Sequence, residues 1–399
     1  MTTTTTVERP FYDRVMEAVP SGEKLKLCLQ CGMCSGICPY GFAMNFPPQS
    51  LIAAVRAGDL DPVFESETIW LCVSCFACAS VCPAQIPLTS GLMASLKTEM
   101  LLRRKVPAEL QTALENTRRY GNTLGESPRK RSAWSQNLTP PIPVMAQTKE
   151  PVDVLWFVGD YASYHPRAML ASQAMAKVFQ ALGIRFGILG PEENSDGDVQ
   201  YLAGERGLLE ILAQKNGKVL RKYQYQEIVT TDPHAYNVIK HEYPGVGVSV
   251  PIKHYTQFLA ERIEQIKPLM RHEHKSIVTY HDPCAIGRAN KNNIFEEPRL
   301  VLSAIPGLEL VEMAHNRATS ICCGGGGGGN WLDGFAWQQT HTRMSEWRIQ
   351  EALASGAQIL AVACPYEAPR FEDALKSMGS ENKLVVKDIA ELLAEAMSA

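Results

Sequence analysis

The chain has 399 residues, with 39 lysines and arginines against 42 aspartates and glutamates, which gives a formal net charge of −3. This near-neutral balance argues against nucleic acid as the main partner. Hydrophobic residues make up 45% of the chain and charged residues 20%, a composition typical of globular proteins, and the length predicts two or three domains.

The N-terminus lacks the features of an export or membrane signal. The segment Thr2–Thr6 has no apolar centre, and no part of the chain approaches the roughly 20 consecutive apolar residues of a spanning helix. We therefore expect residues 1–19 to form a flexible tail. We expect the protein to be cytoplasmic, or held on the inner face of the membrane by a partner.

Eight of the twelve cysteines fall in two runs with the same spacing, C-x2-C-x2-C-x3-C-P. Bacterial ferredoxins hold [4Fe–4S] cubanes with this run, and the fourth cysteine of each run binds the other cluster. Residues 20–105 are therefore predicted to form a mainly helical ferredoxin-type domain with two cubanes. The predicted ligands are Cys28, Cys31, Cys34 and Cys82 for the first cluster, and Cys72, Cys75, Cys78 and Cys38 for the second.

Two other interpretations of these cysteines are weaker. A disulfide framework suits a small secreted domain. Structural zinc usually takes paired knuckles rather than four thiols per run. Neither alternative explains Pro39 and Pro83, which follow the fourth cysteine of each run and fix the turn beyond the last ligand.

Residues 106–150 are predicted to form a basic, proline-rich helix and linker. We expect the basic side chains around this segment to be solvated, since runs of charge usually face solvent. The alternative is a docking surface for an acidic partner. The residues concerned are Arg103, Arg104, Lys105, Arg118, Arg119, Arg129, Lys130 and Arg131, followed by Thr139–Pro143.

From Pro151 onward, apolar strand-like runs alternate with helical segments, which predicts parallel βαβ units. The fold class is therefore α+β overall: a mainly helical domain followed by two α/β domains. The expected strands are Val152–Val158, Ile184–Leu189, Glu227–Thr231, Ile277–Tyr280, Leu308–Glu312 and Gln358–Ala363, with a helix over Ala168–Leu182.

The two α/β segments, 151–268 and 269–399, form an internal repeat. Asp160, Ser195-Asp196 and Asp232 in the first copy correspond to Cys284, Cys322-Cys323 and Cys364 in the second. The intervals of 34 and 35 residues in the first copy match those of 37 and 40 in the second. The first copy has no cysteine, so we interpret it as a degenerate domain that acts as scaffold or partner surface.

The four cysteines of the second copy are predicted to hold a third cluster. Cys284 and Cys364 each follow a predicted strand, and Cys322-Cys323 stand at a loop entrance. Because ligand sites gather at the carboxyl ends of parallel strands, these side chains are expected to converge on one edge of the sheet.

Three neighbouring features are candidates for supporting roles at this site. The six glycines from Gly324 to Gly329 are expected to let backbone N–H groups approach the cluster sulfurs, and Gly324 and Gly325 are the main candidates. The alternative is that the glycine run is a flexible linker. His281 is interpreted as a residue that supports the ligands rather than as a ligand. Glu367 can be an oxygen ligand, a proton donor or a surface carboxylate, and the sequence does not choose.

With these motifs the chain resembles the fused iron–sulfur subunit of heterodisulfide reductase, its relatives in sulfate-reducer redox complexes, and anaerobic glycerol-3-phosphate dehydrogenase. The resemblance implies a two-cubane module before two cysteine-rich domains with the pattern C…CCG…C-x-x-C. Family members that reduce disulfides use a non-cubane assembly with five thiolates. Here Glu367 takes the last position and leaves four thiolates, the number that an ordinary cubane needs. The first cysteine-rich domain has none of the ligands, so we expect one cluster in this half and altered chemistry.

The predicted function is electron transfer within a multi-subunit anaerobic oxidoreductase. Electrons would pass through the two ferredoxin-type clusters to or from the third cluster. The expected partners are a flavin-containing or hydrogenase-like subunit and a reductase or membrane quinone-reactive subunit. The alternative is a catalytic disulfide or thiol reductase that acts at the third cluster. A third interpretation, a cluster-free interaction module, would make the last four cysteines plain thiols.

Overall fold

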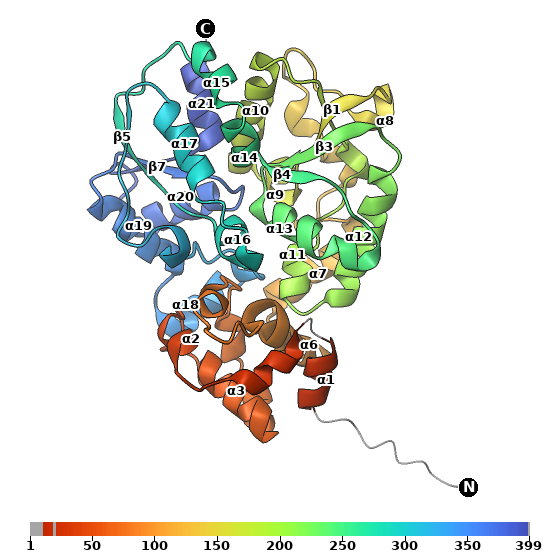
Figure 1. Cartoon of the computed structure of the whole chain (residues 1–399), viewed down its shortest axis with the longest axis vertical. Helices are drawn as coiled ribbons and strands as arrows, with labels where there is room; N and C mark the ends of the chain where they lie inside the picture. Colours follow the sequence, from red (N-terminus) through yellow and green to blue (C-terminus); the bar gives the residue numbers. More distant parts are fainter. Residues whose placement is uncertain (1–10, 19–20, 398–399) are drawn as a thin grey trace.

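The computed structural model describes residues 11–18 and 21–397. The N-terminal domain lies below two α/β domains that stand side by side (Figure 1). Part of the expected tail is ordered, because Phe11–Ala18 forms helix α1, while the rest of residues 1–19 lies outside the described residues. No helix in the described ranges has the length and apolar character needed to cross a membrane.

The N-terminal domain consists of short helices that pack around the cysteine loops, as the sequence predicts. Its core contains Leu51, Trp70, Leu96 and Met100, which are each 1% exposed or less. The elements are α1, η1 (Gly22–Leu27), α2 (Met33–Gly36), α3 (Pro48–Ala57), α4 (Asp61–Glu65), η2 (Thr68–Leu71), α5 (Ala77–Ser80), η3 (Leu88–Met93) and α6 (Ala94–Leu102).

The connecting segment departs from the expectation of a wholly solvated linker. Helix α7 (Ala108–Tyr120) starts after Pro107 and ends at Gly121, whose φ of 72° suits glycine. Arg118, Arg119, Arg129 and Lys130 are exposed as expected. Arg131, however, is only 2% exposed, so the prediction is wrong for this residue. The remaining elements are η4 (Pro128–Lys130), η5 (Ala133–Ser135) and α8 (Met145–Thr148).

The two α/β domains contain parallel four-stranded sheets with the same topology, which confirms the predicted βαβ pattern. The strand orders are β2-β1-β3-β4 and β6-β5-β7-β8. The strands are β1 (Val152–Phe157), β2 (Phe186–Ile188), β3 (Tyr225–Thr230) and β4 (Ile252–His254) in the first sheet, and β5 (Ser276–Tyr280), β6 (Leu308–Leu310), β7 (Ile359–Val362) and β8 (Val385–Asp388) in the second.

Helices cover both faces of these sheets. In the first domain they are α9 (Asp160–Tyr164), α10 (Pro166–Ala181), η6 (Gly190–Glu192), α11 (Asp198–Leu202), α12 (Arg206–Leu220), α13 (Pro233–His241), η7 (Tyr243–Val246), α14 (Tyr255–Ala260), α15 (Ile263–Ile266) and η8 (Lys267–Leu269). In the second they are α16 (Cys284–Gly287), η9 (Ala289–Lys291), α17 (Glu296–Ala304), η10 (Arg317–Thr319), η11 (Gly329–Trp331), α18 (Asp333–Thr340), α19 (Met344–Ala354), α20 (Glu367–Ser377) and α21 (Ile389–Met397).

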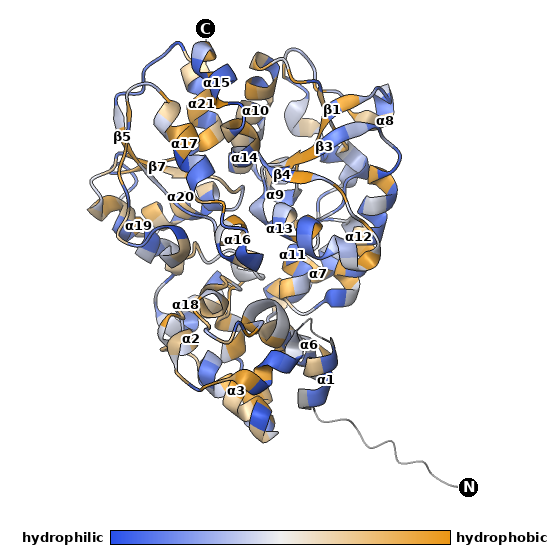
Figure 2. Cartoon of the chain, in the orientation of Figure 1, coloured by the Kyte–Doolittle hydropathy of each residue, from blue (hydrophilic) through white to orange (hydrophobic). Residues whose placement is uncertain are grey.

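The central strands β1 and β7 form because most of their residues are apolar on both faces, as buried parallel strands require. All four residues of β7 are buried, and Figure 2 shows β1 mainly in the hydrophobic colour. The edge strands β4 and β8 were not among the expected strands. Both contain polar residues, such as Lys253 and Lys387, that interrupt the apolar run.

The two α/β domains share one core. Trp156 and Phe179 of the first and Tyr280 and Leu393 of the second belong to the same buried cluster. Helix α10 packs on α21, and α14 packs on α17. Since α10 corresponds to α17 in the repeat and α14 to α21, the two contacts are equivalent. This reciprocal packing is that of an approximate two-fold axis between the copies of the repeat.

The glycine run Gly324–Gly329 is a packed segment and not a linker. All six residues are buried. A Cβ on Gly329 would lie 2.0 Å from the carbonyl oxygen of Gly324, and one on Gly327 would lie 2.4 Å from Ser74 Oγ. Glycine is therefore required where the second α/β domain meets the N-terminal domain.

Gly329→Ala should lower the thermal unfolding midpoint of the protein by several degrees, because backbone must move to admit the methyl group. The matched control is Gly207→Ala in α12, where a Cβ meets no atom within 4 Å. That substitution should leave the midpoint unchanged or raise it slightly. Equal midpoints for the two variants would contradict the packing argument.

Candidate metal centres

The first cysteine group lines a cavity at the surface of the N-terminal domain. Its members are Cys28, Cys31, Cys34 and Cys82. Cys31 is exposed and Cys34 is buried. The Gln30 side chain donates a hydrogen bond to Cys28 Sγ at 3.3 Å, which is a contact suited to an anionic sulfur.

The second cysteine group lines a separate cavity, together with Tyr40, Val73 and Met344. Its members are Cys38, Cys72, Cys75 and Cys78. Each cavity thus takes three cysteines from one run and the last cysteine from the other. Burial raises the pKa of the Cys78 thiol well above its usual range, and the neighbouring cysteines add to the effect.

The two loops have the same backbone conformation. Gln30 and Ser74, which precede the second cysteine of each run, have φ values of 54° and 53°. Gly32 and Phe76, which follow it, have φ values of 80° and 60°. Alternation of left-handed and right-handed residues turns successive N–H groups toward one side and makes a concave site for anions. The loops therefore fit anionic iron–sulfur clusters.

The third cysteine group lies at the carboxyl edge of the second sheet, as the sequence predicts. Cys284 opens α16, and Cys364 follows β7. The sulfurs of Cys284 and Cys322 are 3.8 Å apart, which is too far for a disulfide. The backbone N–H groups of Gly324 and Gly325 donate to the sulfurs of Cys322 and Cys323, at 3.3 and 3.5 Å.

The four thiols of the third group are buried, so they either keep their protons or bind a metal. Cys284, Cys322, Cys323 and Cys364 are 1 to 8% exposed. The adjacent Cys284 raises the pKa of Cys322, Cys322 raises that of Cys323, and burial raises that of Cys364, in each case well above the usual range. Four thiolates can share this space when bound iron compensates their charge. All twelve cysteines of the chain are free of disulfides.

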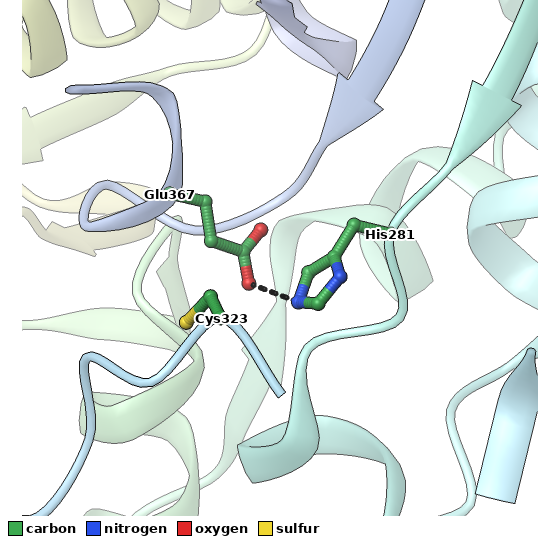
Figure 3. A group of neighbouring side chains, drawn as sticks. All are labelled: His281, Cys323 and Glu367. Carbon is green, nitrogen blue, oxygen red and sulfur yellow. Dashed lines mark ion pairs between the residues drawn. The ribbon is translucent and has the colours of Figure 1, made fainter. Parts of the chain in front are cut away.

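Glu367 and His281 face the third group from the side of Cys323 (Figure 3). The carboxylate of Glu367 is 3.3 Å from His281 Nε2, and a metal-binding atom of each of these residues and Cys323 lies within 4.8 Å of the others. Burial raises the pKa of Glu367 well above its usual range, and burial lowers the pKa of His281. The site thus adds a buried oxygen donor to the four sulfurs.

Arg288 connects the second and third groups. Its Nε donates to the carbonyl of Cys75 at 2.9 Å, and its guanidinium also donates to the carbonyls of Ala318 and Ser320, just before Cys322. Lys97 makes a second link, because its buried Nζ donates to the carbonyls of Cys72 at 2.7 Å and Gly327 at 3.4 Å. Two buried cations therefore join the cysteine loops of different domains.

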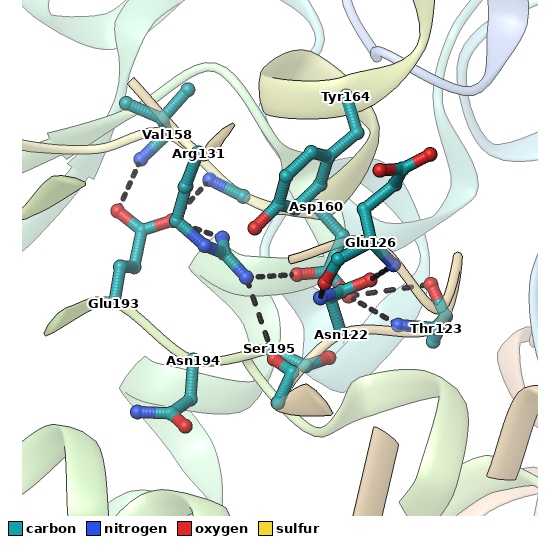
Figure 4. A network of polar contacts seen from close by, with 12 residues as sticks. Asn122, Thr123, Glu126, Arg131, Val158, Asp160, Tyr164, Glu193, Asn194 and Ser195 are labelled. Carbon is teal, nitrogen blue, oxygen red and sulfur yellow. Dashed lines mark hydrogen bonds and ion pairs between the residues drawn. The ribbon is translucent and has the colours of Figure 1, made fainter. Parts of the chain in front are cut away.

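The equivalent place in the first α/β domain holds an ion-pair network instead of cysteines (Figure 4). Arg131 pairs with Asp160 and with Glu193, at 2.7 Å in each case. Glu193 also accepts from the backbone N–H groups of Val158 and Gly159. Asp160 corresponds to Cys284 in the repeat, so a salt bridge occupies the degenerate position.

The other two degenerate positions are also acidic and buried. Asp196 and Asp232 are 4% and 0% exposed. Burial raises the pKa of Asp232 to about 6. Although burial opposes its charge, a 2.7 Å contact with Asp198 raises the pKa of His234 to about 10. His234 is the counterpart of Tyr366, and the two rings meet at a centroid distance of 5.1 Å.

Sequence reasoning missed Arg131, Arg288 and Arg348 as structural partners of these sites. Each is less than 10% exposed. Apart from Glu351, which pairs with Arg348 within α19, their partners are main-chain carbonyls, a histidine nitrogen and carboxylates far away in sequence, and residue spacing carries no sign of these contacts. A weak sign exists for Arg288, which lies four residues after Cys284 at the C-terminal end of α16.

Comparison with protein families identifies the two cluster-binding regions. Residues 24–86 match the 4Fe-4S dicluster domain, and residues 278–366 match the cysteine-rich CCG domain. The dicluster match implies two [4Fe–4S] clusters in the N-terminal domain. The CCG match covers Cys284, Cys322, Cys323 and Cys364 and suggests a further cluster.

Several known proteins are similar to this chain. The D component of the dihydromethanophenazine:CoB–CoM heterodisulfide reductase of Methanosarcina barkeri is 29% identical over 77% of this chain and 73% of its own length. The chain resembles heterodisulfide reductase D-like iron–sulfur oxidoreductases with dicluster and CCG domains. The probable iron-sulfur-binding oxidoreductase FadF of Bacillus subtilis is 32% identical to this protein over 75% of the chain.

Another relative, the probable membrane-anchored ferredoxin of Chromohalobacter salexigens, is 31% identical over 93% of this chain. The heterodisulfide reductase D-like chain spans 42% of the length of FadF and 59% of the length of the membrane-anchored ferredoxin. The resemblance that the sequence predicts is confirmed, and the names of FadF and of the heterodisulfide reductase relative describe oxidoreductases.

Arg131→Met should lower the free energy of unfolding by about 3–5 kcal/mol at neutral pH, because Asp160 and Glu193 lose the cation that compensates their buried charge. Since burial raises the pKa of an unpaired carboxyl group above its unfolded value, protonation on acidification should reduce this deficit between about pH 8 and pH 5. Urea unfolding of the anaerobic protein at several pH values measures both effects.

Arg185→Met is the matched control. The Arg185–Asp153 pair is also close, at 2.6 Å, but the arginine is 69% exposed. Its loss should therefore leave the free energy of unfolding nearly unchanged, since exposed ion pairs contribute little to stability. A similarly small effect of Arg131→Met, or a deficit independent of pH, would contradict a structural role for the buried network.

Proposed function

We propose that this chain is an electron-transfer subunit that carries three iron–sulfur clusters in a spatial series. The ligands of the first are Cys28, Cys31, Cys34 and Cys82, those of the second are Cys38, Cys72, Cys75 and Cys78, and those of the third are Cys284, Cys322, Cys323 and Cys364. The observation that carries this proposal is the direct contact between the second and third cysteine groups.

The loop that carries the second cysteine group packs directly against the segment that follows Cys323. Val73, from the second cysteine loop, belongs to the same buried cluster as Cys284, Cys322 and Cys323. The carbonyl of Val73 would lie 3.1 Å from a Cβ on Gly326, so the two backbones touch. Electrons that reach the second cluster therefore have the third as a neighbour.

The exposure of the cysteines differs between the three groups and indicates which cluster is most accessible from outside. Cys31 of the first group is exposed, the members of the second group are intermediate, and those of the third are buried. Leu29 and Met33, which also line the first cavity, are 74% and 51% exposed. External electrons therefore exchange most directly with the first cluster.

Burial also favours electron relay over direct disulfide chemistry. The four cysteines of the third group and Glu367 are each less than 10% exposed. The three ligand sets use all twelve cysteines, which leaves no dithiol for thiol exchange. The catalytic alternative would need a substrate to reach this enclosed site.

The names of the relatives indicate the kind of partners with which such a chain works. We propose that the chain works within a multi-subunit oxidoreductase, between a flavin-containing or hydrogenase-like subunit and a reductase or quinone-reactive membrane subunit. The names of the Methanosarcina and Chromohalobacter relatives, a heterodisulfide reductase and a membrane-anchored ferredoxin, support this setting. A cytoplasmic position on the inner face of the membrane fits the same role.

Anaerobically purified protein should contain about twelve irons and about twelve sulfides per chain, as three [4Fe–4S]-type clusters require. Cys364→Ala should remove about four irons and one EPR signal, and it should leave the two ferredoxin-type signals in place. Iron and sulfide analysis with EPR measures both. About eight irons in the unmodified protein would contradict the three-cluster proposal.

A charge placed beside the first cluster should change the rate at which methyl viologen radical cation reduces the protein. Leu29→Glu should raise this rate and Leu29→Lys should lower it, by about two-fold each at low ionic strength, and stopped-flow absorbance measures it. Leu300→Glu, at a 48% exposed position on α17, is the control with the same net charge. Equal effects at both positions would argue against electron entry at the first cluster.

A further inference from the structure

Glu367 occupies a ligand position by its spacing. It follows Cys364 by three residues, as Cys31 follows Cys28 and Cys75 follows Cys72. Its backbone N–H donates to the carbonyl of Cys364 at 3.0 Å, so the segment from Cys364 to Glu367 is one tight turn at the start of α20. The turn brings the carboxylate to the same edge of the sheet as the cysteine sulfurs.

In the described ranges the carboxylate forms no direct ion pair with an arginine or a lysine. Glu367 is 1% exposed, and within the described ranges its ion-pair neighbour is His281. The backbone N–H of Ala363 reaches it only at 3.4 Å. A buried carboxylate without a cationic partner is costly, so a bound proton or a metal ion must neutralise it.

The contacts of His281 fix its tautomer. Arg348 Nε donates to His281 Nδ1 at 3.0 Å, and an arginine can only donate. The neutral imidazole therefore carries its proton on Nε2, the nitrogen that faces Glu367 (Figure 3). This Nε2 is buried and has no hydrogen-bond partner in the part of the chain that the structure describes. A protonated nitrogen cannot bind iron, so His281 is a donor at this site.

We propose that Glu367 binds an iron ion of the third cluster through a carboxylate oxygen, with the Nε2–H of His281 directed at that carboxylate. This inference rests on the proposed third cluster. It makes the donor set four sulfurs and one oxygen, in place of four sulfurs alone. Carboxylate oxygen is a harder ligand than thiolate, so one iron of the cluster differs from the others.

The experiment uses the complete anaerobic protein, with its glutamate residues labelled with ¹³C. Electron–nuclear double resonance on the EPR signal of the third cluster should show a ¹³C coupling of the size of a bound carboxylate. Glu367→Gln should abolish this coupling. Glu372→Gln, a change in the same helix α20 at a residue that pairs with Arg167, should leave it intact.

The outcomes separate this inference from the proposed function. A third-cluster signal without ¹³C coupling in the unmodified protein overturns the ligand assignment alone. A ligand-sized coupling to ¹⁵N in protein labelled at histidine would make His281 the ligand and would also overturn it. Absence of any third-cluster signal, with about eight irons per chain, overturns the proposed function itself.

Discussion

The close packing of backbone against backbone at Gly326–Gly329 holds the arrangement together. A side chain in this run would push the second cysteine loop, at Val73 and Ser74, away from the loop that carries Cys322 and Cys323. Arg288 and Lys97 donate to carbonyls on both sides of the same contact. Neutral carbonyls accept these cationic donors, so the charges stay close to the clusters without pairing with a carboxylate.

The two copies of the repeat solve the same burial problem in different ways. In the second copy, strand ends present thiols that bound iron can neutralise. In the first copy, the corresponding edge presents carboxylates, and Arg131 from the connecting segment compensates two of them. The shared core and the paired helices α10 and α21 pack the first copy directly against the second.

The sequence predicts the cysteine groups, the parallel sheets and the repeat because each depends on local spacing or on apolar periodicity. It does not predict the contacts that join the domains. Arg131 belongs to a basic segment that the sequence predicts to face solvent, and only the tertiary fold buries it. The short edge strands β4 and β8 escape notice because Lys253 and Lys387 break their apolar pattern. The tautomer of His281 depends on Arg348, which is 67 residues away.

The central claim is that the second and third clusters are immediate neighbours in one electron path. EPR spectroscopy of the fully reduced protein tests this claim most directly, because two paramagnetic clusters that lie close together couple magnetically. The account predicts that the signal of the third cluster splits or relaxes faster once the second cluster is reduced. A third-cluster signal that stays unsplit and unchanged in relaxation would contradict it.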